Sequence, residues 1–238
     1  MKKHWIAALV VCTAALCACG AKPTDASKPS NPSQQTEGNQ QTETPDDSAS
    51  LLAPLPAAIT TDNLPDATFA AAFEAEDVKE ADGVVTIDLT VYDYDVYDGV
   101  EVARLLEAGS GQMILQGERF DVTYIHEDEN GYVFINGGIE QDGYVLAPGD
   151  GGTYHAIGFD DYKYYNEVTQ ATLPVSADCV LTDEVDLEAG PQTYTGAELL
   201  ARLTGGPDAN LGYHFGEYNT QVTTQEGQIT AIHRIFTP

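Results

Sequence analysis

Positive charge is scarce in this sequence, and that scarcity excludes several classes of partner. The 238 residues include ten Lys or Arg against 38 Asp or Glu, and the part from Leu51 to Pro238 includes six against 33, a net charge of −27. Such a surface repels nucleic acid and anionic lipid, so we expect no nucleic-acid partner. Electrostatic attraction would favour divalent cations, basic peptides or basic proteins, unless the acidity serves only to keep the protein soluble.

Cysteine and tryptophan are nearly absent as well. Cys179 is the only cysteine after residue 50, so no internal disulfide can form in that part of the chain. It stands in an apolar, strand-like stretch, which predicts a buried and unreactive thiol. The one tryptophan, Trp5, lies close to the N-terminus, which argues against a sugar-binding platform built on tryptophan.

The motifs of common enzymes are also missing. The sequence contains no Gly-x-Ser-x-Gly, no Ser-x-x-Lys, no phosphate-binding loop and no dinucleotide fingerprint. The histidines after residue 50 have no metal-binding spacing; they are His126, His155, His214 and His233. Paired carboxylates could still serve a hydrolase, because a sequence gives no distances between side chains. These absences favour a binding protein over an enzyme.

The N-terminus has the layout of a secretory signal peptide. Lys2 and Lys3 precede a run of apolar or small residues from Trp5 to Ala18, which is too short to span a bilayer stably. The end of this run and the two residues after it, Leu-Cys-Ala-Cys-Gly at 16–20, resemble the lipobox of bacterial lipoproteins, although a small residue is usual at the position of Cys17. The resemblance implies that residues 1–18 are removed and that Cys19 is lipidated, which would hold the protein at the outer face of the cell membrane. An ordinary secretory signal is the alternative.

The rest of the chain divides by composition into a tether and an exported domain. Residues 19–50 are rich in Ser, Thr, Pro, Gln and Asn and have almost no branched or aromatic side chains, so we expect a disordered tether. Residues 51–238 are long enough to bury a core. They form either one domain or two subdomains with a boundary near residue 170.

Alternating apolar residues predict a mainly β fold, a β-rich α+β domain of antiparallel hairpins. The runs 69–75 and 85–91 predict a hairpin around the turn at 81–83, although the alanine-rich stretch 67–75 could instead be a short helix. The runs 222–224 and 229–236 predict a closing hairpin around 226–227. Short runs between residues 112 and 159 predict a small meander or barrel. Two short helices are expected, from Asp98 to Gly109 and from Thr195 to Gly205, each with a capping box at its start.

Four aspartates near the strand at 85–91 are the candidate metal site, for calcium: Asp88, Asp93, Asp95 and Asp98. Calcium prefers several carboxylate oxygens, but the spacing does not match an EF-hand. A solvated acidic strand end is the alternative. Strict alternation would place Asp93 and Asp95 on the same face as Val91, so we expect either a bulge near Tyr92 or a strand that leaves the core. The acidic stretches 127–130 and 160–161 are more typical of turns.

Tyrosine is the one enriched aromatic residue, and it occurs in two clusters: Tyr92, Tyr94 and Tyr97, and Tyr162, Tyr164 and Tyr165. Tyrosines serve well in protein recognition and can stack on sugars, although strand tyrosines are often half-buried sheet residues. Several segments of the chain resemble segments of lipoproteins from Gram-positive anaerobes: 90–95, 161–162 with 173–175, and 232–238. That resemblance implies the same export route and brings no activity, ligand or catalytic residue with it.

These features together predict a membrane-anchored extracellular lipoprotein. We expect a binding or interaction module for a cation, peptide, glycan or protein partner, with no cofactor other than the candidate calcium ion. A secreted hydrolase with a carboxylate or histidine site is one alternative, and a structural module of the cell envelope is another.

Overall fold

The computed structural model describes residues 50–205 and 214–237. The expected signal peptide, the lipidation site at Cys19 and nearly all of the expected tether lie outside the described residues. In chain order the helices and strands are β1 (Leu51–Leu52), β2 (Thr68–Ala72), β3 (Val78–Ala81), β4 (Val84–Tyr94), β5 (Val96–Asp98), α1 (Gly99–Ala108), β6 (Gly111–Leu115), β7 (Glu118–Val122), β8 (Ile125–Glu127), β9 (Val133–Ile135), β10 (Tyr144–Pro148), β11 (Thr153–Ile157), β12 (Tyr165–Glu184), β13 (Gln192–Thr195), α2 (Gly196–Thr204), β14 (Thr220–Gln225) and β15 (Gln228–Ile235). The predicted fold class, mainly β with two short helices, is confirmed.

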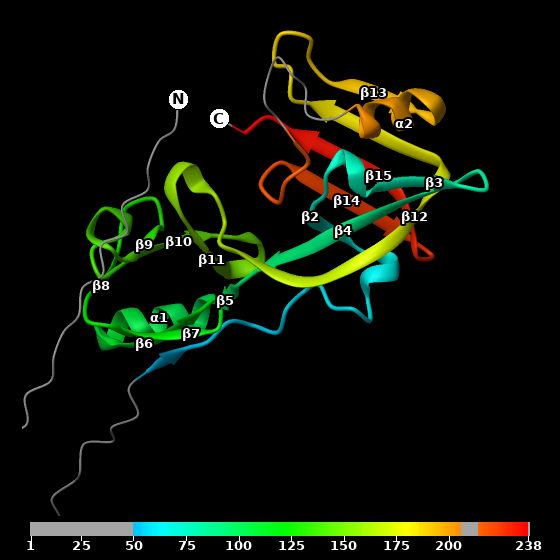
Figure 1. The fold of residues 1–238 in the computed structure, drawn as a ribbon. Coiled ribbons are helices and arrows are strands. Elements are labelled where there is room, and N and C mark those ends of the chain that lie inside the picture. The colour runs from blue at the N-terminus through cyan, green and yellow to red at the C-terminus, as the bar shows by residue number, and fades with distance from the viewer. Residues whose placement is uncertain (1–49, 206–213, 238) are drawn as a thin grey trace, which may run out of the picture. The chain divides into compact units, whose positions relative to one another are not determined.

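The largest sheet closes on itself through one long strand, β12 (Figure 1). The first half of β12 pairs antiparallel with β4, and the second half pairs parallel with β15. Since β15 pairs with β14, β14 with β2, and β2 with β4, the ring of strands is complete. Closure removes the unpaired edges that an open sheet would expose. β3 and β13 extend this barrel at its margins.

The barrel core follows from the alternation in β4. Ile87, Leu89 and Val91 are buried, while the residues between them are only partly covered. Leu199 and Leu203 of α2 pack into the same core, one helical turn apart. Cys179 of β12 also belongs to it and is fully buried, as predicted. Burial raises the pKa of this thiol to about 11, which keeps it protonated and unreactive at neutral pH.

A second core is formed by the chain between β4 and β12, together with β1. It lies among α1 and two sheets. One sheet has three strands in the order β1, β6, β7, and the other has five strands in the order β5, β11, β10, β9, β8. Tyr97, Leu105 and Met113 are among its fully buried members. The chain thus enters this region after Tyr94 and returns to the barrel at Tyr165, shortly before the boundary that was expected near residue 170. The described residues form one compact unit.

Turns and helix ends agree closely with the sequence pattern. Gly83 and Gly227, in the turns before β4 and β15, both have positive φ, as tight hairpins require. The Asp98 carboxylate accepts hydrogen bonds from the first turn of α1, and Gly109 ends that helix in the left-handed conformation. The predicted meander is present as β8 to β11, whereas β6 and β7 belong to a different sheet.

Two local predictions were wrong in detail. The hairpin around 81–83 is made by β3 and β4, while β2 pairs with a later part of β4 and with β14. Thr195 precedes α2 as expected but makes no capping hydrogen bond through its side chain. It is instead the last residue of β13, where it pairs with Val180, so its backbone is held by the sheet.

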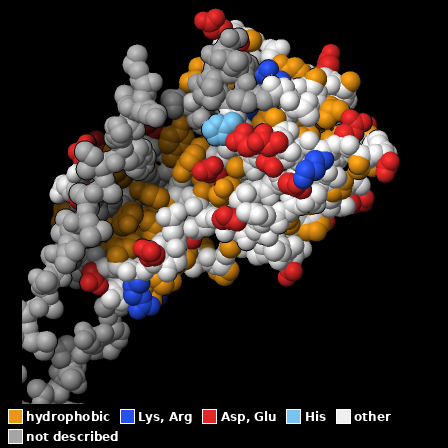
Figure 2. Space-filling model, viewed as in Figure 1, with side chains coloured by type: hydrophobic (Ala, Val, Ile, Leu, Met, Phe, Trp, Pro, Cys, Tyr) orange, Lys and Arg blue, Asp and Glu red, His pale blue; other side chains and the backbone are white. Residues whose placement is uncertain are grey.

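Acidic side chains are spread over the face seen in Figure 2, and Lys or Arg side chains appear there at only a few places. This agrees with the strong negative charge of the sequence. With so many carboxylates, those bonded to other groups of the fold have a structural role, and only the others are available to a ligand.

Candidate functional site

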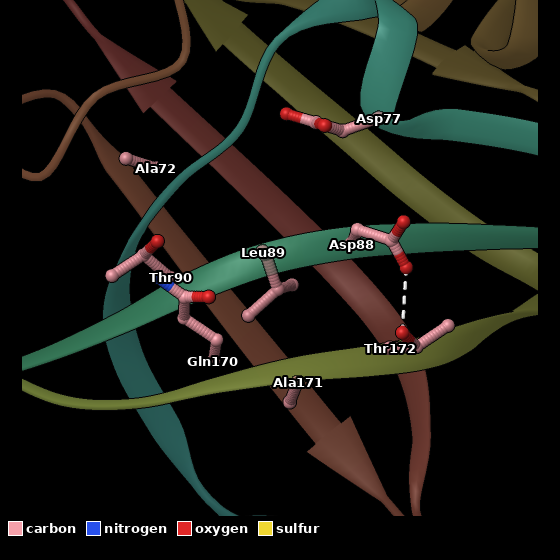
Figure 3. A pocket seen from close by; sticks show the side chains of 8 residues that line it. All are labelled: Ala72, Asp77, Asp88, Leu89, Thr90, Gln170, Ala171 and Thr172. Carbon is pink, nitrogen blue, oxygen red and sulfur yellow. Dashed lines mark hydrogen bonds between the residues drawn. The ribbon is translucent and has the colours of Figure 1, made fainter.

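Asp88, the first of the four candidate calcium ligands, is engaged in holding strands together. It lies on β4 in an open pocket, where it accepts a hydrogen bond of 2.6 Å from the Thr172 hydroxyl of β12 (Figure 3). It also forms an ion pair with Lys79 of β3. Lys79 and then Thr172 hold the pKa of Asp88 below its ordinary value. Asp77, which lines the same pocket, accepts a hydrogen bond from the Glu74 backbone.

Asp93 is buried and satisfied by backbone groups. Only 8% of it is exposed, and its two carboxylate oxygens accept hydrogen bonds of 2.9 Å from the N–H groups of Ile59 and Tyr94. β4 keeps its alternation through this residue, so both sequence-based alternatives were wrong: the strand neither bulges at Tyr92 nor leaves the core. The register shift lies in the partner strand, β12, between Glu167 and Thr169.

The last two aspartates have separate partners. Asp95 accepts hydrogen bonds from the Gln116 N–H at 2.6 Å and from the Asn166 amide at 2.9 Å. Asp98 caps α1. The structure therefore does not bring the four aspartates together. Among residues 50–205 and 214–237, no group of three or more His, Cys, Asp or Glu side chains is arranged to hold a metal ion.

The four histidines also have different neighbours. His126 stacks on Phe134, with ring centroids 5.0 Å apart, and the edge of His155 meets Tyr94 at 5.6 Å. Burial, followed by the charge of Lys163, lowers the pKa of His155. His233 Nε2 lies 3.2 Å from a carboxylate oxygen of Glu184, and His214 contributes its backbone carbonyl to a bond with the Asn219 amide. Each histidine thus belongs to a different local environment.

Tyrosine rings from three separate segments do converge. We define the tyrosine surface as Tyr92, Tyr94, Tyr162, Tyr165 and Tyr218. Tyr94 of β4 is paired directly with Tyr165 of β12, and their ring centroids lie 6.0 Å apart. Tyr218, from the segment before β14, contacts Tyr162 at 5.0 Å and Tyr165 at 5.6 Å. Strand pairing thus joins members of both sequence clusters.

The remaining members of the two clusters lie elsewhere. Tyr97 is fully buried in the second core, where its hydroxyl donates a 2.8 Å hydrogen bond to the carbonyl of Ile114. Tyr164 packs against Tyr144, with centroids 5.9 Å apart. The sequence clusters were therefore only partly informative, and Tyr218 was missed because it belongs to neither of them.

A cavity of about 230 Å³ opens on the tyrosine surface. Tyr92, Tyr94 and Tyr165 line it, and Ala70 of β2, which is paired with Tyr92, leaves it open because its side chain is a single methyl group. Typical small-molecule pockets measure roughly 300 to 1,000 Å³. This cavity is therefore suited to one side chain or one sugar ring.

Carboxylates lie close to these rings. Burial, followed by the charges of Glu217 and Glu167, raises the pKa of Tyr92. Burial, followed by the neighbouring Tyr94 and Tyr218 rings and by Glu217, raises the pKa of Tyr165 to about 12. The two phenols therefore stay protonated at neutral pH and can donate hydrogen bonds. The surface carries charges of both signs, because Lys163 also lines the cavity and its amine lies 3.9 Å from the centroid of Tyr94.

A separate group of charges is buried in the barrel. Arg234 is 2% exposed and binds both oxygens of Asp183, at 3.1 and 2.6 Å. Arg202 of α2 reaches the same carboxylate at 2.9 Å, and the Arg234 guanidinium lies 4.5 Å from the centre of the Phe215 ring. Burial opposes ionisation of Asp183, but the bonds and charge of Arg234 outweigh it, so its pKa lies below the ordinary value. These charges are already satisfied within the fold.

Comparison with known proteins gives no relative: no family model, no curated protein and no solved structure matches the chain. Within the described residues, no helix is long and apolar enough to cross a membrane.

Proposed function

We propose that this protein is a lipid-anchored extracellular binding module, which contacts its partner through the tyrosine surface. The lipobox-like segment at 16–20 supports export and lipidation at Cys19, and two acyl chains provide stable anchorage where one is marginal. In this arrangement the negatively charged domain stands outside the cell membrane, where it meets partners that are themselves exposed on the envelope.

The observation that carries the binding role is the convergence of partly exposed tyrosines around one cavity. Tyr218 is 45% exposed although it contacts two other rings of the surface. Tyrosine buries a large, rigid area at low entropic cost and offers a hydroxyl for hydrogen bonding, which is why it is enriched in protein interfaces. A surface rich in such side chains favours recognition of a partner over catalysis.

Anchoring is tested by replacing the lipidated residue. Cells that express the wild-type protein and the Cys19→Ala variant would be grown with a labelled fatty acid, and the protein would be followed by fractionation. We expect the wild type to carry label and stay with the membrane, and the variant to lose the label. Unmodified wild-type protein would contradict the anchoring proposal.

The tyrosine surface is tested by site-specific crosslinking in living cells. A photoreactive phenylalanine analogue would replace Tyr218 in one variant and Tyr124 in a matched control. Tyr124 is 54% exposed, and among the described aromatic rings it contacts that of His126 and none of the tyrosine surface. We expect a defined adduct with an envelope component at position 218 and none at position 124. Equal adducts at the two positions, or none at either, would contradict a role for the tyrosine surface.

A further inference from the structure

Building on the function proposed above, we infer that the partner of the tyrosine surface is a glycan, and that one of its neutral sugar rings enters the cavity between Tyr92, Tyr94 and Tyr165. The charges around the cavity, the polar side chains along its floor and the aromatic rings of its wall each favour a neutral sugar over a charged or an apolar ligand.

Charges of both signs meet at this cavity. Lys163 lines it, with its amine over the Tyr94 ring. Glu167 is paired with Tyr92 across the β4–β12 ladder, and burial, followed by the charge of Glu217, raises the pKa of the same Tyr92 phenol. A cationic ligand would be repelled by the lysine, and an acidic polymer would be repelled by a domain of net charge −27. A neutral ligand meets neither repulsion.

One row of paired residues crosses four strands of the barrel at the floor of the cavity. Gln221 of β14 is paired with Ala70 of β2, and Ala70 is paired with Tyr92 of β4. Directly paired residues point to the same face of a sheet about 5 Å apart, so an amide and a phenol stand on either side of the Ala70 methyl group. Glu167 of β12 continues the row beyond Tyr92. Closely spaced donors and acceptors of this kind match the hydroxyl groups of a sugar ring.

Several polar groups of the lining are open to a ligand. Gln221 is exposed, and its side chain has no hydrogen-bond partner in the described part of the chain. The Lys163 amine forms no ion pair with any described carboxylate. Thr68 shares its hydroxyl with Thr223 at 2.9 Å, and a hydroxyl can take part in more than one such bond. An apolar ligand would cover these groups without bonding to them, which is costly, whereas sugar hydroxyls both donate and accept.

Aromatic rings form the wall of the cavity. Tyr165 meets Tyr94 at 6.0 Å and Tyr92 at 6.4 Å, with interplanar angles of 89° and 75°. The three rings thus meet edge-on instead of closing into a face-to-face stack, and all three side chains are only partly buried. The C–H groups of a sugar ring can pack against this apolar wall while its hydroxyls bond to the floor. The volume of about 230 Å³ limits the occupant to one ring.

The test uses the full chain, purified from membranes in a neutral detergent that has no sugar head group. Its probes are three fractions released from the organism's own cell envelope: neutral oligosaccharides, acidic oligosaccharides and peptides. We expect the neutral oligosaccharides to bind, and the other two fractions not to bind. Because the recognised ring is uncharged, the affinity should change by less than about twofold as salt rises.

Variants of lining residues locate the sugar. Tyr92→Leu should weaken binding of the neutral fraction about 5- to 30-fold, because it removes an aromatic contact together with a hydroxyl. Gln221→Ala should weaken it about 2- to 10-fold, through the loss of one hydrogen bond. Gln225→Ala is the matched control and should leave the affinity unchanged, because Gln225 is exposed on the same strand but lines a different pocket.

Lys163→Gln separates a neutral ligand from an anionic one. The change removes the charge but keeps a hydrogen-bond donor, so binding of the neutral fraction should change by no more than about 3-fold. Binding of the acidic fraction to the wild type, with loss in Lys163→Gln, would overturn the neutral ligand.

The remaining outcomes separate the sugar ligand from the function on which it rests. Failure of the neutral fraction to bind, with the crosslink at position 218 intact, would overturn the sugar ligand and leave a binding module. Binding of the peptide fraction, with loss in Tyr92→Leu, would overturn it in favour of a peptide ligand. Equal affinity of the wild type, Tyr92→Leu and Gln221→Ala for the neutral fraction would place the sugar elsewhere and overturn it too. Absence of both the crosslink and binding would contradict the proposed function itself.

Discussion

Tyr97 of the second core and Tyr165 on the tyrosine surface of the barrel show how one residue type can serve two purposes. Tyr97 is completely buried, and its hydroxyl is bonded to a backbone carbonyl of the second core. Tyr165 of the barrel is partly exposed and is surrounded by other tyrosine rings and by the charge of Glu217. The first tyrosine has all its partners inside the fold, whereas the second retains surface that a partner can cover.

The same contrast holds for the charges. Asp183 is buried and bonded by two arginines, so its charge contributes to the fold. Glu167 and Glu217 lie beside the tyrosine surface, where their charge acts on Tyr92. The difference indicates that substitutions in the buried ion cluster or the second core should change stability, and that substitutions at the tyrosine surface should change binding.

The largest expected effect on stability is that of Arg234→Met. This change leaves the Asp183 carboxylate buried with only Arg202 as a charged partner, and we expect a loss of about 3 to 5 kcal/mol in the free energy of unfolding, measured with urea. Arg104→Met, which breaks the exposed pair with Glu101, is the matched control and should cost about 1 kcal/mol or less. Equal losses of stability in the two variants would show that the buried cluster contributes no more to the free energy of unfolding than an exposed ion pair does.

Acid should weaken the fold through the same cluster. The pKa of Asp183 is lower in the folded protein than in the unfolded chain, so its stabilising contribution is present above the ordinary value of about 4 and is lost as the pH falls below it. We expect the free energy of unfolding to decline on acidification, and to decline less steeply in Asp183→Asn. Identical pH profiles for the two proteins would be incompatible with this assignment.

Tyr97→Phe should have a smaller effect on stability and none on binding. The change leaves the Ile114 carbonyl without its partner, at a cost of about 1 to 3 kcal/mol. The crosslink formed from position 218 should be the same in this variant as in the otherwise unchanged protein, because Tyr97 is not part of the tyrosine surface. Weaker binding by Tyr97→Phe would break the distinction between the two regions.

The smallest effect on stability is expected for Ala70→Leu. The larger side chain should fill the cavity beside Tyr92, so we expect the crosslink from position 218 to be lost while the free energy of unfolding changes by about 1 kcal/mol or less. Ala72→Leu is the matched control, because Ala72 lies on the same strand but lines the neighbouring pocket of Asp88. Equal loss of binding in both variants would place the ligand elsewhere.

Local features of the fold could be predicted from the sequence, because they depend on neighbours in the chain. The turn glycines at 83 and 227, the Asp98 cap and the alternation of β4 each follow from a few adjacent residues. β12 was not predicted as one strand of 20 residues. It contains Pro174, and its register shifts between Glu167 and Thr169, so no single alternation runs through it.

The candidate site could be predicted only in part, since its residues come together through long-range pairing. The burial of Asp93 depends on the N–H of Ile59, which lies 34 residues earlier in the chain, and no pattern marks that contact. Tyr218 reaches the surface from a segment that lies outside both sequence clusters of tyrosine. Two sequence clusters of tyrosine were visible, but only the pairing of Tyr94 with Tyr165 shows that members of both belong together.

The most direct test of the tyrosine surface is nuclear magnetic resonance of the protein with isotope-labelled tyrosine rings, during titration with the partner that is captured by the crosslink at position 218. The ring signals of Tyr92, Tyr165 and Tyr218 should move together with a single affinity, while those of Tyr97 and Tyr124 should stay in place. Movement of the Tyr124 signal to the same extent, or no movement of the three surface signals, would contradict the assignment of this surface as the binding site.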